Sequence, residues 1–344
     1  MDEPLRRILV TGAQGFLGRH VVRALLGSYH DVEILGIGRS KYSRDAFTHS
    51  IRWAGKLTQA PVPRYLLLNK DSREYEYAPL DLLDKSATAH RIRDFQPDAV
   101  IHLASALSGD AVEDIMRIGI DGTVSLLEAL AESKTRKVRF VYASSGAVYG
   151  CVSESLLPIQ ESTPTNPVDL YGLAKLAGEH VCRILGEMTG IEVIYARLFN
   201  LVGPGQGERH VCGRFAAQAA AISLDLTPEV VRTGDIETTR DLIDVRDSAR
   251  AVVSLAQKGR AGEIYNIASG EEIAVGSILA SVIRQAGLAS RVTLERDGEL
   301  PVGVRRHVGS VARLESLGFR REHSMEASLK DLLNYYLCEV SLYR

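Results

Sequence analysis

Residues 7–18 read RILVTGAQGFLG, an apolar, β-branched run followed by three glycines at the spacing GxxGxxG. The run predicts a buried strand, and residues 16–26 predict a helix. Gly12 suits the tight turn between them, Gly15 lets the backbone approach a pyrophosphate, and Gly18 lets the helix pack on the strand. The free N–H groups at the helix start attract phosphate. The stretch therefore predicts a dinucleotide-binding loop; a purely structural turn is the alternative.

Strands and helices alternate through the first half of the chain. We expect strands at residues 7–11, 32–38, 75–80, 99–104, 138–143 and 191–198, and helices at residues 16–26, 122–132 and 171–189. This order predicts an α/β fold, a doubly wound parallel sheet of the Rossmann type. Residues 1–196 are expected to form the NAD(P)-binding domain, with a return segment near residues 240–257. Residues 197–344 should mainly form a smaller C-terminal substrate-binding domain.

Composition excludes several classes of protein. The 344 residues carry a formal net charge of -2, which gives no bulk attraction to nucleic acid or to a membrane surface. The apolar run near the start is too short for a signal peptide, and no stretch approaches the ~20 apolar residues of a membrane span. The four cysteines form no CxxC pair, and the nine histidines show no metal-binding spacing. We expect a cytoplasmic protein with free thiols and no bound metal.

Residues 40–73 form an unusually long excursion after the second predicted strand. It carries the only tryptophan, Trp53, together with Pro61 and Pro63. It is interpreted either as a surface excursion, since loop insertions are generally tolerated, or as a lobe near the adenine-ribose end of the cofactor.

The end of the second strand indicates which dinucleotide binds. An NAD-preferring site usually has an acidic residue about 20 residues after the glycines, but here Gly38 is followed by Arg39 and Ser40. A cation and a hydroxyl suit a 2′-phosphate, so NADP is expected and NAD remains the alternative. The remaining expected cofactor contacts are Gln14, Phe16 and Leu17 in the glycine loop, Asp81 and Leu82 after the third strand, and Leu103, Ala104 and Ser105 after the fourth.

Three further residues suit hydride-transfer chemistry. Tyr171 and Lys175 are four residues apart in a predicted helix, so they share one face, and Ser145 follows the fifth strand. Reduction of a ketone creates an alkoxide that needs a proton, and the reverse reaction needs a base. A phenol with a pKa of about 10 is a poor base, and a lysine ammonium and the positive nicotinamide ring are expected to lower that pKa. The serine hydroxyl would hold the substrate oxygen.

Taken together, the motifs resemble the extended short-chain dehydrogenases/reductases, a family of NAD(P)-dependent nucleotide-sugar epimerases, dehydratases and reductases. The resemblance covers nearly the whole chain. Its motifs are TGAQGFLG (11–18), PDAVIHLA (97–104), SSGAVYG (144–150), YGLAK (171–175), RLFNLVGPG (197–205) and RDLIDVRD (240–247).

The resemblance implies roles for matched residues. Ser145, Tyr171 and Lys175 would be the catalytic triad, and Asn200 would contact the phosphates or the sugar of the substrate. Arg240 would grip a diphosphate oxygen, unless it forms a structural pair with Asp241 or Asp244. The other implied substrate contacts are Ser144, Arg214 and Arg305. The family also implies a homodimer built through helices near residues 114–130 and 171–189.

The chain also departs from the family pattern. Many sugar 4,6-dehydratases have an acid pair after the catalytic serine or threonine, where this chain has Gly146 and Ala147, so dehydration by that route is not expected. Gly119 stands where a family asparagine supports a helix bend. Leu300 and Gly303 stand where an arginine and an acid are usual, which weakens the local match around Arg305.

Two further segments point to one reaction. Residues 199–221 and 158–164 most resemble GDP-4-keto-6-deoxymannose reductases, and reductive biosynthesis generally uses NADPH. The leading hypothesis is a nucleotide-sugar 4-ketoreductase in which Tyr171 protonates the new oxygen. The alternatives are a C4 epimerase that uses the same triad and retains its nicotinamide, and a cofactor-sensing binding protein without turnover.

Overall fold

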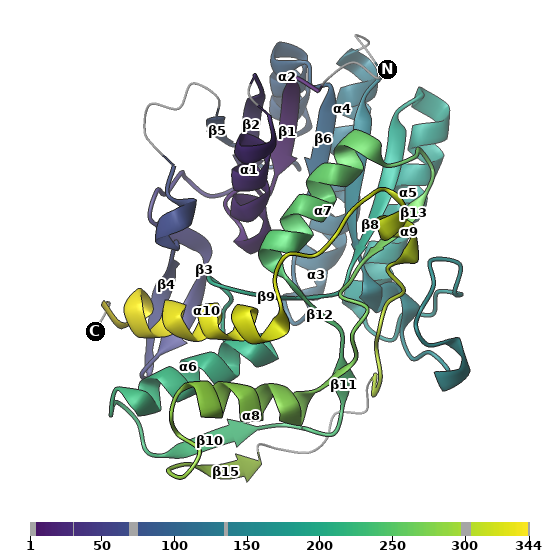
Figure 1. The fold of residues 1–344 in the computed structure, drawn as a ribbon. Helices are drawn as coiled ribbons and strands as arrows, with labels where there is room; N and C mark the ends of the chain where they lie inside the picture. The colour runs from purple at the N-terminus through teal and green to yellow at the C-terminus, as the bar shows by residue number, and fades with distance from the viewer. Residues whose placement is uncertain (1–4, 30, 69–74, 134–136, 297–303, 343–344) are drawn as a thin grey trace.

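The computed structural model describes residues 5–29, 31–68, 75–133, 137–296 and 304–342. At its centre lies a seven-stranded sheet in the order β13-β8-β7-β6-β1-β2-β5 (Figure 1). Its neighbouring strands all pair in parallel. In chain order they are β1 (Arg7–Thr11), β2 (Glu33–Gly38), β5 (Tyr75–Pro79), β6 (Ala99–His102), β7 (Arg139–Ser145), β8 (Glu192–Leu198) and β13 (Ile264–Ile267). The α/β, Rossmann-type prediction is confirmed.

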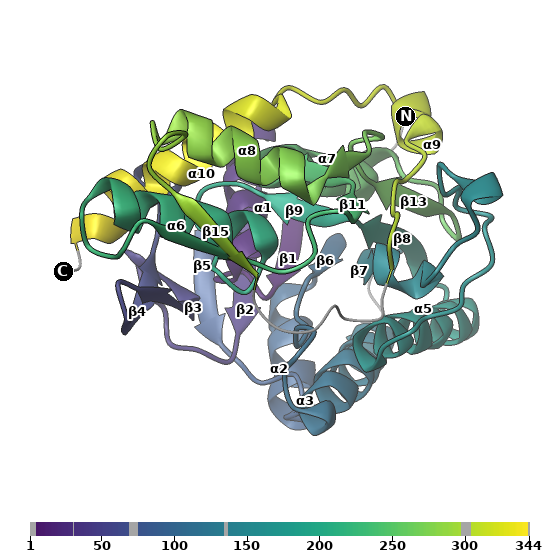
Figure 2. The same ribbon diagram turned by 90° about the horizontal axis from the view of Figure 1, so that it is seen from below.

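Helices cover both faces of this sheet. One face carries α1 (Phe16–Ser28) and α7 (Val245–Lys258); the other carries α2 (Lys85–Phe95), α4 (Gly122–Ser133) and α5 (Leu170–Thr189). Figure 2 shows α2 and α5 on one side of the strands and α7 on the other. Alternation within β1 produces this layering: Ile8 and Val10 pack with Leu25 of α1, whereas Leu9 packs with Leu126 of α4.

The sheet order places the site. The chain continues from β1 to β2 on one side of β1, and β6 lies on its other side. In open α/β sheets, ligands bind in the crevice at the carboxyl ends of the strands where the winding direction switches. The residues that directly follow β1, β2 and β6 therefore share one edge of the sheet.

The second half of the chain forms a smaller group of elements. These are β9 (Asn200–Val202), α6 (Val211–Ser223), β10 (Val230–Thr233), β11 (Thr239–Arg240), β12 (Leu242–Asp244), β14 (Ile273–Ala274), α8 (Val275–Gln285), β15 (Thr293–Arg296), α9 (Ala312–Ser316) and α10 (Met325–Cys338). The short strands pair as β9 with β12, β10 with β15, and β11 with β14. Besides the return helix α7, the strand β13 also comes from this half and completes the central sheet.

The excursion after β2 is built into the core of the second half. It forms an antiparallel hairpin of β3 (Ala46–Trp53) and β4 (Lys56–Pro61), followed by the 3-10 turn η1 (Arg64–Leu66). Phe47, Ile51 and Trp53 are buried in one cluster with side chains of α6, α8 and α10. The hairpin is therefore part of the core and is not a surface excursion. Only the start of the excursion lies beside the end of β2. Residues 69–73 lie outside the described ranges.

A bend separates two helices on the sheet face that carries α5. The short helix α3 (Val112–Met116) continues through a π-helical turn (Arg117–Asp121) into α4. Thr123 Oγ1 donates to the Gly119 carbonyl oxygen at 2.8 Å. This hydrogen bond from Thr123, one turn later, supports the bend. Gly119, which stands where the family has an asparagine, is therefore compatible with the fold.

Candidate functional site

The glycine loop has the geometry that a diphosphate needs. Gly12 has a φ of +67°, and its carbonyl oxygen accepts the Gly15 amide at 2.9 Å, which closes the tight turn. A Cβ on Gly18 would lie 2.1 Å from the Gly12 carbonyl oxygen, so only glycine permits this contact between helix and loop. Gly15, without a side chain, occupies the N-cap of α1. The amides at the start of α1 can therefore bind an anion, and the loop fits a dinucleotide diphosphate.

Gln14 is directed into the protein. Its side chain is only 2% exposed. Its Nε2 donates to the Lys41 carbonyl oxygen at 3.0 Å, and its Oε1 accepts the Ser43 amide at 2.7 Å. Gln14 thus joins the glycine loop to the segment after β2, whereas its neighbours Phe16 and Leu17 begin α1 and are half-buried.

Arg39 and Ser40 lie where the sequence placed them, directly after β2, and both are exposed. The Tyr77 hydroxyl on β5 donates to the carbonyl oxygens of Gly38 and Ser40, at 3.1 and 2.8 Å. The backbone turn that presents both side chains is therefore fixed from the neighbouring strand. Asp81 and Leu82 follow β5; the Asp81 carboxylate accepts the Leu83 amide, and Leu82 is buried beside Gly122.

A buried histidine holds the loop after β6. The amides of Leu103 and Ala104 donate to Thr11 Oγ1 at 3.1 and 3.0 Å, and that oxygen lies 2.7 Å from His102 Nδ1. His102 Nε2 lies 3.0 Å from Thr123 Oγ1. Burial, together with Lys175, lowers the pKa of His102 to about 3, so the ring is neutral and serves as a hydrogen-bonded spacer. Sequence reasoning gave His102 no role.

Ser105, the last of the expected contacts after β6, is half-buried. Its hydroxyl donates to the Ala106 carbonyl oxygen at 2.8 Å. It continues the segment that Thr11 fixes, so Leu103, Ala104 and Ser105 follow β6 beside the glycine loop. A Cβ on Gly12 would lie 3.0 Å from the Ala104 amide nitrogen, which shows how close the two segments are.

The structure brings Ser145, Tyr171 and Lys175 together. Ser145 ends β7, and Tyr171 and Lys175 lie in the first two turns of α5. Lys175 Nζ lies 5.8 Å from the centre of the Tyr171 ring and donates to the Ala143 carbonyl oxygen at 2.7 Å. Ser145 Oγ accepts the Ala147 amide at 3.1 Å. Asp169 caps α5 by accepting the Gly172 amide, which fixes the helix start next to the phenol.

Burial is the largest influence on the electrostatics of Tyr171 and Lys175. Burial raises the pKa of Tyr171 above its ordinary value, and the hydrogen bond with Ser145 lowers it only in part. Burial also lowers the pKa of Lys175 to about 8. The expected lowering of the phenol pKa, which combines the Lys175 ammonium with the positive nicotinamide ring, stays a prediction.

A buried ion pair lies behind the triad. Arg197 and Glu179 form a bidentate contact, with Nε–Oε1 and Nη2–Oε2 distances of 2.8 and 2.7 Å, and their side chains are 4% and 8% exposed. Ser144 Oγ donates to Glu179 Oε1. Ser144, expected as a substrate contact, is thus buried and engaged with the protein. Sequence reasoning missed Glu179, although its i,i+4 spacing from Lys175 places it on the same face of the helix.

Asn200 on β9 contacts the backbone of Asp241, the residue that directly follows Arg240 on β11. Asn200 Nδ2 donates to the Asp241 carbonyl oxygen at 3.1 Å. Arg240 Nη1 donates to the Thr239 carbonyl oxygen at 2.7 Å, and burial lowers the pKa of its guanidinium. The Asp241 carboxylate instead accepts amides at residues 269, 270 and 309. Asp244 pairs with Arg246. The structural pairs considered for Arg240 are therefore not formed.

Two further arginines were expected to contact substrate. The backbone of Arg305 adjoins Arg240, since its carbonyl oxygen accepts the Thr239 amide at 2.9 Å and lies 3.5 Å from Arg240 Nη1. The Arg305 side chain is exposed. Arg214 is exposed on α6, where its amide donates to the His210 carbonyl oxygen. Leu300 and Gly303, the departures near Arg305, lie outside the described residues.

His307 is a neighbour of the triad that sequence reasoning missed. A Cβ on Gly146 would lie 2.9 Å from its Cε1, and its ring stacks against Phe199 with a centroid distance of 4.7 Å. Burial lowers its pKa to about 4, so the ring is neutral. Gly146 and Ala147 form the start of a 3-10 turn directly after Ser145. The glycine at position 146 makes room for the imidazole.

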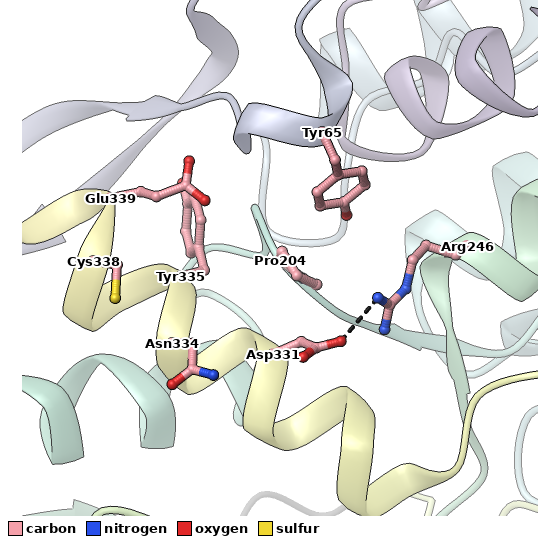
Figure 3. Close-up of a pocket in the computed structure, with 8 residues that line it drawn as sticks. All are labelled: Tyr65, Pro204, Arg246, Asp331, Asn334, Tyr335, Cys338 and Glu339. Carbon is pink, nitrogen blue, oxygen red and sulfur yellow. Dashed lines mark ion pairs between the residues drawn. The ribbon is translucent and has the colours of Figure 1, made fainter.

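A separate cavity of about 290 Å³ lies between η1 and α10 (Figure 3). Its lining residues are Tyr65, Pro204, Arg246, Asp331, Asn334, Tyr335, Cys338 and Glu339. Arg246 forms ion pairs with Asp244, which does not line the cavity, and with Asp331, which does. The N–O distances are 2.7 and 2.8 Å. The guanidinium charge is thus already neutralised, and the triad residues do not line this cavity.

Within the described ranges, no helix is long and apolar enough to cross a bilayer. No group of three or more His, Cys, Asp or Glu side chains in the same ranges could hold a metal ion. All four cysteines are free thiols.

The sequence was also compared with known proteins. Residues 8–268 match the sequence model described as the NAD dependent epimerase/dehydratase family. A GDP-6-deoxy-D-mannose reductase from Pseudomonas aeruginosa is 32% identical over 335 residues, which cover 96% of each chain. A putative UDP-glucose 4-epimerase from Methanocaldococcus jannaschii is 28% identical over 95% of this chain and 97% of the relative.

Two solved structures share the fold and more than a quarter of the sequence. RMD from Pseudomonas aeruginosa, complexed with NADPH, has a TM-score of 0.77 at 29% identity and covers 96% of this chain and 99% of its own. The UDP-glucose 4-epimerase of Thermus thermophilus, in complex with NAD, has a TM-score of 0.78 at 26% identity, with 97% and 99% covered.

The buried ion pair generates a stability prediction. We expect Glu179→Gln to lower the free energy of unfolding by about 3–5 kcal/mol, because it leaves the Arg197 guanidinium buried without its carboxylate. Glu187→Gln is the matched control, since Glu187 forms an exposed pair with Arg183 on the same helix, and should change that free energy by less than about 0.5 kcal/mol. Urea denaturation followed by circular dichroism measures both. Equal effects of the two variants would refute the prediction.

Proposed function

The chain belongs to the NAD-dependent epimerase/dehydratase family, and from this premise we propose that it reduces the 4-keto group of a GDP-linked 4-keto-6-deoxy sugar with NADPH. It is an enzyme of the nucleotide-sugar reductase, epimerase and dehydratase group. The reductase from Pseudomonas aeruginosa and the NADPH complex of its RMD support the choice of reaction and cofactor. The observation that carries the proposal is the 32% identity to a GDP-6-deoxy-D-mannose reductase over 96% of each chain, together with the meeting of Ser145, Tyr171 and Lys175 at the end of β7 and the start of α5.

The residues present fit the cofactor. The glycine loop at Gly12, Gly15 and Gly18 would hold the diphosphate, and Arg39 and Ser40 would hold the 2′-phosphate. Leu103, Ala104 and Ser105 would border the nicotinamide ribose, and Asp81 and Leu82 the adenine. When bound, NADPH supplies a hydride to the carbonyl carbon.

The chain's own residues then control one proton. Tyr171 is placed to give its phenolic proton to the oxygen of the former ketone. Ser145 Oγ accepts the Ala147 amide, which leaves its own proton to donate toward Tyr171 or the substrate oxygen and so aligns the two. Lys175 donates to the Ala143 carbonyl oxygen, and its ammonium stabilises negative charge at the phenol after proton transfer.

The second half of the chain, residues 197–344, is proposed to supply most of the substrate contacts. Asn200 binds the backbone of the residue after Arg240, and the partly desolvated Arg240 guanidinium is suited to a diphosphate. Arg305 joins them through its backbone, and Arg214 is proposed as a further contact. For Ser144 we propose support of the site through Glu179. Four free thiols are consistent with the cytoplasm as the location.

A C4 epimerase is the second candidate, supported by the relatives that carry that name. Its first half-reaction removes a proton from a sugar hydroxyl, so it needs Tyr171 to act as a base. The higher identity to the reductase, 32% against 28% for the putative epimerase, favours reduction instead. Dehydration through an acid pair has no suitable groups at Gly146 and Ala147.

Mixing the purified protein with NADPH and a GDP-linked 4-keto-6-deoxy sugar tests the proposal directly. We expect stoichiometric loss of nicotinamide absorbance. Tyr171→Phe should reduce turnover at least about a hundredfold, because the proton donor is gone, while NADPH binding is retained. Tyr195→Phe on β8 is the control and should keep turnover. Retained cofactor binding without NADPH loss would replace the reductase by the epimerase, and UDP- and GDP-hexoses would then be screened for inversion.

The lysine gives a pH dependence. With a pKa of about 8, Lys175 carries its charge below that pH and loses it above. We therefore expect kcat/KM for reduction to be constant below about pH 8 and to fall above it. Lys175→Arg should be less active but should hold its activity to higher pH, because a guanidinium stays charged. An identical alkaline fall in this variant would show that another group controls the limb.

We further propose a homodimer through α5 and the helices near residues 114–130. Leu173, Ile184 and Met188 are 45%, 48% and 75% exposed, and with Ala177 and Val181 they form one apolar stripe at helical spacing on α5. Ile184→Glu should convert the dimer to a monomer in size-exclusion chromatography with light scattering. Leu57→Glu, at an exposed position on the hairpin, should leave the mass unchanged. A monomeric parent protein would refute the proposal.

A further inference from the structure

We infer that Gln14 and Arg19 set the preference for NADPH over NADH, although neither is placed to touch the 2′-phosphate itself. The inference rests on the proposed use of NADPH. It assigns to these two residues a positioning role: they hold the segment of residues 41–46 as a wall of the 2′-phosphate subsite.

The segment that they hold is rich in groups that bind phosphate. Arg39, Lys41 and Arg44 place three cations within six residues, and Ser40 adds a hydroxyl, whereas the Ser43 hydroxyl already binds Asp45 and the Ala46 amide. Residues 39–45 contain no helix or strand, and the side chains at 39–42 and 44 are exposed. An irregular loop of this kind presents its cations in one geometry only if other groups fix its backbone.

Gln14 and Arg19 fix that backbone at several points. Gln14 binds the Lys41 carbonyl oxygen and the Ser43 amide. Arg19 Nη2 donates to the carbonyl oxygens of Ser43 and Ala46, at 2.5 and 2.7 Å, and lies 3.2 Å from Gln14 Oε1. Both side chains are buried, at 2% and 7% exposure. The loop is therefore fastened to the element that carries the diphosphate-binding glycines.

Arg19 is also a buried cation without a close ion pair. Its partners are carbonyl and amide oxygens and the face of the Phe47 ring, and the nearby Asp45 carboxylate acts on it only beyond ion-pair distance. Burial lowers the pKa of this guanidinium. A buried unpaired charge costs stability, and a neutral side chain could brace the loop without that cost. A phosphate with close to two negative charges, bound on the other side of the loop, would compensate the charge of the Arg19 guanidinium.

The far end of the excursion is held by the next residue of the same helix. His20 Nε2 lies 2.8 Å from the Tyr65 hydroxyl, and the Arg64 amide donates to Glu339, directly after α10. Tyr65 is the residue that overhangs the cavity in Figure 3. Arg19 and His20 thus anchor both ends of the excursion on α1, so its start cannot drift without moving the buried hairpin.

The test compares kcat/KM for NADPH and for NADH with the same sugar substrate. For Arg19→Met and for Gln14→Leu we expect the NADPH/NADH ratio to fall about tenfold, with the NADH value changed less than about threefold. Arg19→Lys should lie between Arg19→Met and the parent. The matched control, Arg23→Met, removes an exposed arginine one turn later on α1 and should leave the ratio unchanged. An unchanged ratio in both Arg19→Met and Gln14→Leu, or equal losses with both cofactors, would overturn the inference.

A binding measurement separates this inference from the proposed reaction. Titration calorimetry with adenosine 2′,5′-bisphosphate and with 5′-AMP needs no sugar substrate. We expect the parent to bind the bisphosphate more tightly, and Arg19→Met to lose only that advantage. Equal affinities in the parent would refute the inference together with the NADP assignment. A bisphosphate advantage that survives in Arg19→Met would refute the inference alone, and a parent with that advantage but no NADPH turnover would refute only the reaction.

Discussion

The close approach of three backbone segments around Gly12 is the constraint on which the rest of the molecule depends. The turn at Gly12 lies against the start of α1 and against the backbone of Leu103 and Ala104. Neither contact leaves space for a side chain. Thr11 fixes the third segment by accepting two of its amides and bonding to a neutral histidine. One crowded point thereby sets the position of the helix dipole, the glycine loop and the segment expected beside the nicotinamide ribose.

The catalytic end of the site is arranged by burial. Tyr171 and Lys175 are both shifted toward their neutral forms, whereas Glu179 and Arg197 remain a charged pair behind them. A buried charged group stays charged where a bidentate partner of opposite charge compensates it. Where such a partner is lacking, burial shifts the pKa of the group toward its neutral form. The site therefore combines two desolvated groups whose pKa values are shifted with a buried ion pair beneath them.

The local sequence pattern predicted those strands and helices whose apolar residues follow a regular spacing. The central strands β1, β6, β7 and β8 are largely buried and read as apolar runs, whereas β13 was not predicted; the helices 16–26, 122–132 and 171–189 end within a few residues of their predicted positions. Helix α2 escaped prediction because its sequence, KSATAHRIRDF, buries only three side chains. The hairpin at residues 46–61 escaped because its partners, α6, α8 and α10, lie more than 140 residues later in the sequence. Residue type and spacing identified the triad, but its pKa values, Arg19 and His102 depend on surroundings that spacing does not encode.

The same hairpin constrains the order in which the chain can fold. Tyr335, close to the C-terminus, donates to the carbonyl oxygen of Pro61, and Trp53 packs beside Tyr336. During synthesis the hairpin therefore emerges early, but its apolar face is fully covered only after α10 has been made. Until then Phe47, Ile51 and Trp53 are accessible to chaperones and to other chains. If the chain were cut between its two halves, the apolar face of the hairpin would be exposed on the N-terminal fragment. We therefore expect that the two halves do not fold independently.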